Sequence, residues 1–171
     1  GVPVAVFERE TSVQEDYRAS TFHAATLDLL EGTGITEALV EMGIKCPIVQ
    51  FRSWDEGRIA EFDHAVLKDD TGYPYRLQCE QYKLGQWLFG KLSETPGVEL
   101  FFGHEVTGFA QDDDGVTVSA KGAGADSQIT LWASFLIGAD GGGSLVRKTL
   151  GIDFPGFTFP ERILVMGTTL D

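Results

Sequence analysis

The sequence of 171 residues is poor in cysteine and contains no long apolar run. Its two cysteines, Cys46 and Cys79, stand far apart and lack both the paired spacing of a zinc site and the density of a disulfide scaffold. We therefore expect two free thiols in a reducing, cytoplasmic compartment, and no metal site. The apolar runs are far shorter than the ~18 residues that a membrane span needs, so no membrane association is expected.

Basic side chains are also scarce, since 13 lysines and arginines face 26 acidic residues and the net charge is −13. That charge repels a nucleic-acid backbone or an anionic bilayer, so neither is an expected partner. An anionic cofactor would have to be held by local groups such as helix N-termini and single arginines. The 43% hydrophobic and 23% charged residues are typical of a globular protein.

Three helices are predicted from apolar residues that recur at intervals of three and four. The first begins at a cap formed by Ser20 or Thr21, and the second covers residues 35–42 with Gly43 as its C-terminal cap. The third runs from about residue 80 to 94 and ends before Pro96. The apolar face of the first helix is expected to consist of Phe22, Ala25, Leu29 and Leu30.

Strand patterns occupy much of the remaining chain. A hairpin is predicted from residue 48 to 62 around Asp55, Glu56 and Gly57, followed by the polar loop HAVLKDDTG and a strand at 73–77. A further strand, VELFF, follows the long helix. The run around Val106, then VTVSA and QITLWA, separated by the turns DDDG and GAGAD, predicts an antiparallel meander.

Two continuous apolar runs, VAVFE and FLIGAD, each end in an acid. Continuous apolar character is typical of parallel strands covered on both faces, so we expect these two runs to be neighbours in an open α/β nucleotide-binding sheet. Glu8 and Asp140 would then lie together at the carboxyl edge. Glu8 could accept hydrogen bonds from a ribose diol; the alternative is a charged residue that only ends a strand.

The stretch GADGGGSLVR joins the second run to a predicted helix that begins at Ser144. Glycines 141–143 would let the backbone approach a ligand, and the helix N–H groups would attract negative charge. Asp140 could accept from a sugar hydroxyl or orient a cation such as Arg18. The alternative is an ordinary strand-to-helix connection with a tight turn.

These segments resemble the FAD-dependent aromatic hydroxylases typified by para-hydroxybenzoate, phenol and phenylpropionate hydroxylases. The resemblance rests on VAVFERE, YRASTFHAATLDLL, CEQYKLGQWLFGKL, PGVELFFGHEVTGF and, most specifically, the Asp-Gly motif in FLIGADGGGSLVRKTLGIDFPG. It departs from the family in lacking a GxGxxG turn before Gly1 and a later Gly-Asp motif. We therefore expect a fragment that retains little FAD by itself.

The resemblance implies a partial Rossmann-like FAD-binding sheet with a β-meander and an inserted piece of a mixed substrate-domain sheet. The FAD-binding part would comprise residues 1–47 and 78–153, and the substrate-domain strands residues 48–77 and 154–171, including the final run ILVMGTTL. Glu8 would bind the adenosine ribose, and Arg18 and Gln81 would lie along the pyrophosphate and ribityl chain. The complete set of implied cofactor-binding residues is Glu8, Arg9, Arg18, Gln81, Val106, Asp140 and Gly141.

The implied activity is a monooxygenase reaction on a small phenolic substrate, with FAD as cofactor, NAD(P)H as reductant and O2 as co-substrate. No catalytic base can be named, because His23, His64 and His104 lack an evident partner. Arg147 matches the last residue of the Asp-Gly motif; its alternative role is at the helix surface or as a partner of an aspartate.

Two other functions stay open: a non-catalytic truncated domain, or another FAD or NAD enzyme such as a halogenase, an epoxidase or a dehydrogenase. The meander favours the flavin group.

Overall fold

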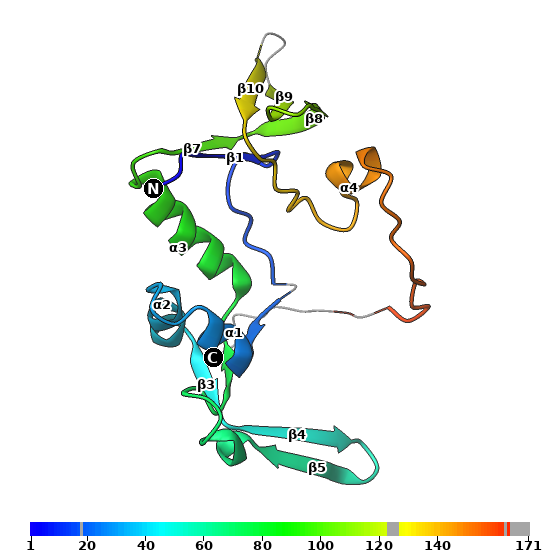
Figure 1. Ribbon diagram of the computed structural model, residues 1–171. Coiled ribbons are helices and arrows are strands. Elements are labelled where there is room, and N and C mark those ends of the chain that lie inside the picture. The colour runs from blue at the N-terminus through cyan, green and yellow to red at the C-terminus, as the bar shows by residue number, and fades with distance from the viewer. Residues whose placement is uncertain (18, 123–126, 163, 165–171) are drawn as a thin grey trace. The chain divides into compact units, whose positions relative to one another are not determined.

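A computed structural model describes residues 1–17, 19–122, 127–162 and 164 (Figure 1). Arg18, residues 123–126 of the turn GAGAD and all of the final run ILVMGTTL except Leu164 lie outside the described residues. The described residues form two compact units: 1–13 with 90–164, and 14–89. This division does not test the expected cofactor-binding and substrate domains, which stay a prediction.

The first unit is built on a parallel strand pair. Strand β1 (Val4–Glu8) pairs in register with β7 (Val98–Phe102), so that Glu8 is opposite Phe102 (Figure 1). The Phe7 and Phe101 rings stack with their centroids 4.8 Å apart. Just beyond both strands, the Gly103 N–H donates to the Glu10 carbonyl at 2.8 Å. The carboxyl ends of the two strands are therefore held together.

The run FLIGAD, residues 135–140, forms no strand, so the expectation that it pairs with VAVFE is wrong. The partner of β1 is β7 instead. A strand exists only where a neighbour satisfies its backbone N–H and C=O groups, and no described segment pairs with these residues. Phe135 and Ile137 are accordingly 88% and 87% exposed. Apolar character alone predicted a strand, but a strand also needs a pairing segment, and none of the described segments supplies one.

The predicted meander is confirmed by three antiparallel strands in the order β10-β9-β8. Their bounds are β8 (His104–Gln111), β9 (Val116–Gly122) and β10 (Gln128–Ala133). In the turn DDDG, the Asp112 carboxylate accepts from the N–H groups of Asp114 and Gly115, both at 3.0 Å. Helix α4 (Leu145–Thr149) begins after Ser144, as predicted, and contacts β8.

The described residues of the second unit form two short helices, most of the longer helix α3, a 3-10 turn, a three-stranded sheet and a hairpin. Helix α2 (Ile35–Met42) has its predicted bounds, and α3 (Gln81–Ser93), which belongs to this unit up to Phe89, has nearly its predicted bounds. The hairpin of β4 (Ile48–Ser53) and β5 (Gly57–Asp63) is also as predicted. The remaining elements are η1 (His64–Leu67), a 3-10 turn in the predicted loop, and a sheet of β2 (Thr21–Phe22), β6 (Arg76–Gln78) and β3 (Ile44–Cys46).

Helix α1 (Ala24–Leu29) starts later than predicted, with His23 rather than Ser20 or Thr21 at its N-cap. Thr21 lies instead in β2, where its hydroxyl donates to the Gln78 side-chain oxygen at 3.0 Å. Pairing with β6 has overridden the local capping preference. The buried face also differs, because Leu27 is 0% exposed whereas Leu29 is 82% exposed.

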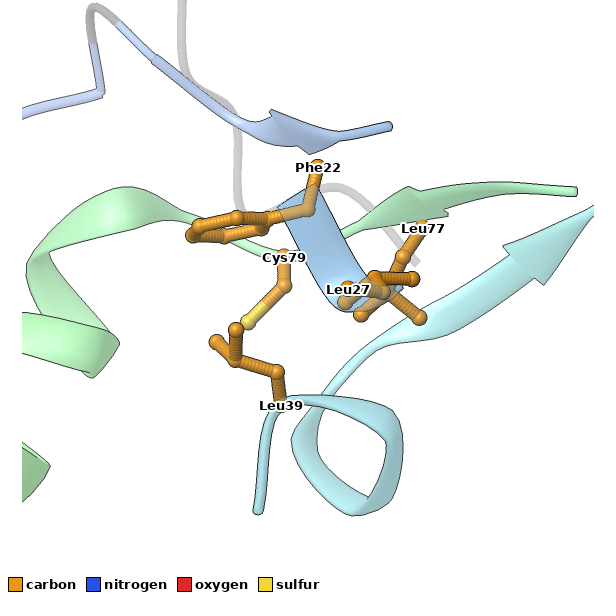
Figure 2. Packing of buried hydrophobic residues seen from close by; sticks show 5 residues of the cluster. All are labelled: Phe22, Leu27, Leu39, Leu77 and Cys79. Atoms are coloured by element: carbon orange, nitrogen blue, oxygen red, sulfur yellow. The ribbon is translucent and has the colours of Figure 1, made fainter. Parts of the chain in front are cut away.

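The core of the second unit is a cluster contributed by β2, α1, α2, β6 and the residue after β6. Figure 2 shows the converging side chains of Phe22, Leu27, Leu39, Leu77 and Cys79. Burial raises the pKa of the Cys79 thiol, and both cysteines are free thiols, as expected. The buried Thr36 hydroxyl donates to the Leu27 carbonyl at 2.7 Å, which joins α2 to α1. None of the helices in the described ranges has the length and apolarity that a membrane crossing demands.

Replacing the core residue Leu27 by Ala should lower the free energy of unfolding of the chain by about 2–5 kcal/mol, since it removes buried methyl groups and leaves a cavity. The matched control is Leu29→Ala on the same helix, where the side chain is exposed. That change should alter stability by about 0.5 kcal/mol or less. Urea unfolding followed by circular dichroism measures both, and equal losses would contradict the assigned core.

Candidate functional site

Glu8 stands at the end of β1, where its side chain is half-buried. One carboxylate oxygen, Oε1, accepts from the Glu10 N–H at 2.8 Å, which orients the group within its own turn. The other oxygen accepts no hydrogen bond from any described residue. Glu8 therefore presents an oriented acceptor at the carboxyl end of a parallel strand, and its binding to a ribose stays a prediction.

Besides Glu8, Asp140 and Gly141, the described residues that the resemblance implies are Arg9, Val106 and Gln81. Arg9 is exposed, with its Nε 3.3 Å from Glu10 Oε1, a surface pair that adds little stability. Val106 is half-buried in β8 opposite Ala120, beside a register shift. Gln81 opens α3, and its backbone N–H donates to the Ala19 carbonyl at 2.9 Å.

The predicted residues are divided between the units. Glu8, Arg9, Val106, Asp140 and Gly141 belong to the first, Gln81 belongs to the second, and Arg18 lies outside the described residues. Their assembly into one cofactor site therefore stays a prediction.

Asp140 is engaged with the helix that follows it. Its Oδ1 accepts from the Ser144 hydroxyl at 2.5 Å, and its Oδ2 accepts from the N–H groups of Leu145 at 2.6 Å and Val146 at 3.2 Å. The Ser144 hydrogen bond, helped by the backbone donors and opposed by desolvation, holds the pKa of Asp140 below its usual 3.8. The sequence predicted that the N–H groups at this helix start would attract negative charge. In the structure, the carboxylate of Asp140 itself supplies that charge.

The glycines after Asp140 leave the backbone open. Gly141 has a φ of +76°, which favours glycine, and a Cβ added at Gly141, Gly142 or Gly143 would meet no atom within 4 Å. The N–H groups of Gly142 and Gly143 donate to no described residue. This turn therefore offers two backbone donors to a ligand beside an acid.

Two nearby contacts were not predicted from the sequence. A Cβ on Gly138 would lie 2.8 Å from the Val146 Cβ, so a glycine there lets α4 pack closely on the extended run. Ser144 was predicted as a helix start, but its hydrogen bond to Asp140 was missed. An acid four residues before a serine N-cap could have indicated that contact.

Arg147 binds backbone carbonyls and pairs with no acid among the described residues. Its guanidinium donates to the Ile152 carbonyl at 3.0 Å and the Gly142 carbonyl at 3.4 Å, and lies 5.0 Å from the Phe154 ring centroid. It therefore ties the glycine turn to the segment that follows α4.

The histidines do not identify a catalytic base within the described ranges. His23 occupies the N-cap position of α1, and His64 and His104 place their Nδ1 atoms 3.1 Å and 2.9 Å from the carbonyls of Pro47 and Phe102. The rings of His64 and His104 thus each lie against a backbone carbonyl, whereas the His23 side chain makes no capping hydrogen bond.

These groups fit a flavin dinucleotide, which presents hydroxyls, phosphates and ring carbonyls. Counting only donors among the described residues, Glu8 has a free acceptor for hydroxyls and Asp140 Oδ1 has room for one more donor, and the Gly142 and Gly143 N–H groups are donors. The first unit thus contains both kinds of group that such a cofactor needs.

Comparison with known proteins agrees with this chemistry. The family model described as "FAD binding domain" matches residues 1–171. Para-nitrophenol 4-monooxygenase of Pseudomonas sp. strain WBC-3 is 33% identical over 171 residues, covering 100% of this chain and 42% of that protein. The 3-(3-hydroxy-phenyl)propionate/3-hydroxycinnamic acid hydroxylase 1 of Burkholderia vietnamiensis is 32% identical over 174 residues, covering 100% and 27% respectively. The chain thus spans less than half the length of either relative.

The fold has a counterpart among solved structures. The crystal structure of p-nitrophenol 4-monooxygenase PnpA from Pseudomonas putida DLL-E4 superimposes with a TM-score of 0.87 at 33% identity, covering 93% of this chain and 40% of that one. The predicted α/β fold class and the resemblance to aromatic hydroxylases are confirmed.

The lowered pKa of Asp140 predicts a contribution to stability that is present above the ordinary pKa of 3.8 and is lost as the pH falls through the lower folded value. An NMR titration of side-chain carboxyl carbons should show Asp140 with a midpoint below 3.8. The Asp140→Asn variant lacks the titrating group and identifies the signal. A midpoint at or above the ordinary value would contradict the capping arrangement.

Proposed function

The chain belongs to the FAD binding domain family, and from this membership we propose that it forms part of the cofactor site of a flavin-dependent aromatic monooxygenase. The observation that supports the proposal most strongly is the family match over all 171 residues. NAD(P)H as reductant, O2 as co-substrate and a phenolic ring as substrate are parts of the same proposal. The printed names of the relatives, a nitrophenol monooxygenase and a hydroxyphenylpropionate hydroxylase, support the substrate class.

In this proposal Glu8 accepts hydrogen bonds from the hydroxyls of the adenosine ribose. Its charge would repel a phosphate on that sugar, which favours a nucleotide without a 2'-phosphate at this position. The Glu8 orientation is already set by the Glu10 N–H, so little conformational freedom would be lost on binding. Arg9, Arg18, Gln81 and Val106 are assigned to the cofactor by resemblance.

The turn after Asp140 would hold a second part of the cofactor. The Gly142 and Gly143 N–H groups would donate to it, while Arg147 holds the turn through the Gly142 carbonyl. When bound, FAD supplies the redox chemistry between NAD(P)H and O2, and this chain supplies binding and orientation. The two free thiols, Cys46 and Cys79, support a reducing cytoplasmic location as part of the proposal.

Glu8→Gln should weaken FAD binding by the whole protein about tenfold or more, because hydrogen bonds to a charged group contribute about 1.5–3 kcal/mol. The control is Glu10→Gln, which changes only an exposed pair with Arg9 and should leave the affinity within about twofold. Flavin fluorescence titration of the apoprotein measures both constants. Equal affinities for the two variants would remove Glu8 from the site.

The activity itself has a direct test. The whole protein should purify with bound flavin and consume NAD(P)H and O2 together when a phenol such as p-nitrophenol is added. Absorbance at the nicotinamide band and an oxygen electrode follow the two losses. A purified protein without flavin, or nicotinamide oxidation that no phenol stimulates, would count against the proposed monooxygenase.

A further inference from the structure

Ser144 is the one buried residue in the described part of residues 134–164, with 7% of its surface exposed. The glycine turn before it is exposed, and no residue of α4 after it is fully buried. A polar side chain that is buried in such an open segment needs partners for its hydrogen-bonding groups.

Both partners of the Ser144 hydroxyl are defined. It accepts from the Arg147 N–H at 3.0 Å, which is an ordinary N-cap contact. Its single proton is donated to Asp140 Oδ1 at 2.5 Å, because an ionised carboxylate can only accept. The same side chain therefore caps α4 and holds the acid.

The carboxylate of Asp140 is nearly saturated. Each carboxylate oxygen offers about two acceptor positions. Oδ2 uses both for Leu145 and Val146, whereas Oδ1 uses one for Ser144. The donors in the described part of the chain leave one acceptor position, on the oxygen that Ser144 holds.

Within the described ranges, no counter-ion helps Ser144 to hold the Asp140 carboxylate. The titratable groups on the same helix are Arg147 and Lys148, and those on the contacting strand β8 are His104 and Glu105. None forms an ion pair with Asp140, and the Arg147 guanidinium is directed to backbone carbonyls. Hydrogen bonds, with that of Ser144 the largest, lower the pKa of Asp140.

We propose that Ser144 is a positioning residue of the cofactor site: it orients the Asp140 carboxylate so that the remaining acceptor position on Oδ1 receives a cofactor hydroxyl. This inference rests on the proposed function, because it needs a cofactor with hydroxyls at Asp140. It assigns to Ser144 an effect on affinity beyond its effect on helix stability.

Three substitutions separate the two roles. Ser144→Thr keeps the donor and the cap, Ser144→Ala removes both, and Ser144→Asp keeps a capping acceptor but removes the donor. A residue that only caps α4 would tolerate Asp. A residue that positions Asp140 would not, because the proton donor is replaced by a like charge.

The experiment measures the FAD dissociation constant of the whole apoprotein at neutral pH, with these substitutions placed in the native background and in Asp140→Asn. Ser144→Ala should weaken binding about tenfold when Asp140 is present but less than about twofold in the Asn background. Ser144→Thr should restore binding to within about twofold, and Ser144→Asp should bind no better than Ala. Thermal unfolding of each apoprotein reports the separate effect on stability.

Each other outcome overturns the inference in a distinguishable way. Equal losses for Ser144→Ala in both backgrounds, or native affinity for Ser144→Asp, would leave Ser144 as a cap only. Native affinity for Asp140→Asn would remove Asp140 from the cofactor contacts while the FAD-binding proposal stands. If the unsubstituted protein binds no FAD, the proposed function fails, and the role of Ser144 fails with it.

Discussion

The parallel pairing of β1 with β7 is the interaction on which the rest of the first unit depends. The in-register ladder and the stacked Phe7 and Phe101 rings place Glu8 at the end of β1, beside the start of the segment that follows β7. Gly103, at a φ of +70°, turns the chain there and donates back to Glu10. Strand β8 follows at once, begins the meander and contacts α4, so the glycine turn belongs to the same unit.

Two acids that look alike in the sequence differ because of the donors around them. Both follow an apolar run, but Glu8 receives one hydrogen bond from its own turn, and its other oxygen accepts none from the residues that the structure describes. Asp140 receives three hydrogen bonds from the helix that it precedes. The Asp140 carboxylate thus occupies N–H groups at the start of α4, and in the described part of this segment the Gly142 and Gly143 N–H groups are left as donors for an anionic ligand.

Local patterns predicted most elements of this chain well. The β4–β5 hairpin, the meander and helix α2 follow from turn residues and apolar spacing within a few neighbouring residues. The predictions were wrong where a residue far away in the sequence decides the local structure. Thr21 pairs with Gln78 in a ladder instead of capping a helix, and the run 135–140, apolar up to its final acid, has no partner strand among the described residues. The same holds for the site, where residue types were predictable but Ser144 as the partner of Asp140 was not.

By itself, the sequence determined the chemistry available: an acid after each of two apolar runs, a side-chain-free turn, a serine helix start and two unpaired cysteines. These are properties of single residues and short spacings. Only the tertiary structure decided that β1 pairs with β7, that Leu27 rather than Leu29 is buried, and that Asp140 caps α4 while one Glu8 oxygen has no donor among the described residues. The physical reason is that strand partners, buried faces and carboxylate donors are chosen by competition among groups that come together only when the chain has folded.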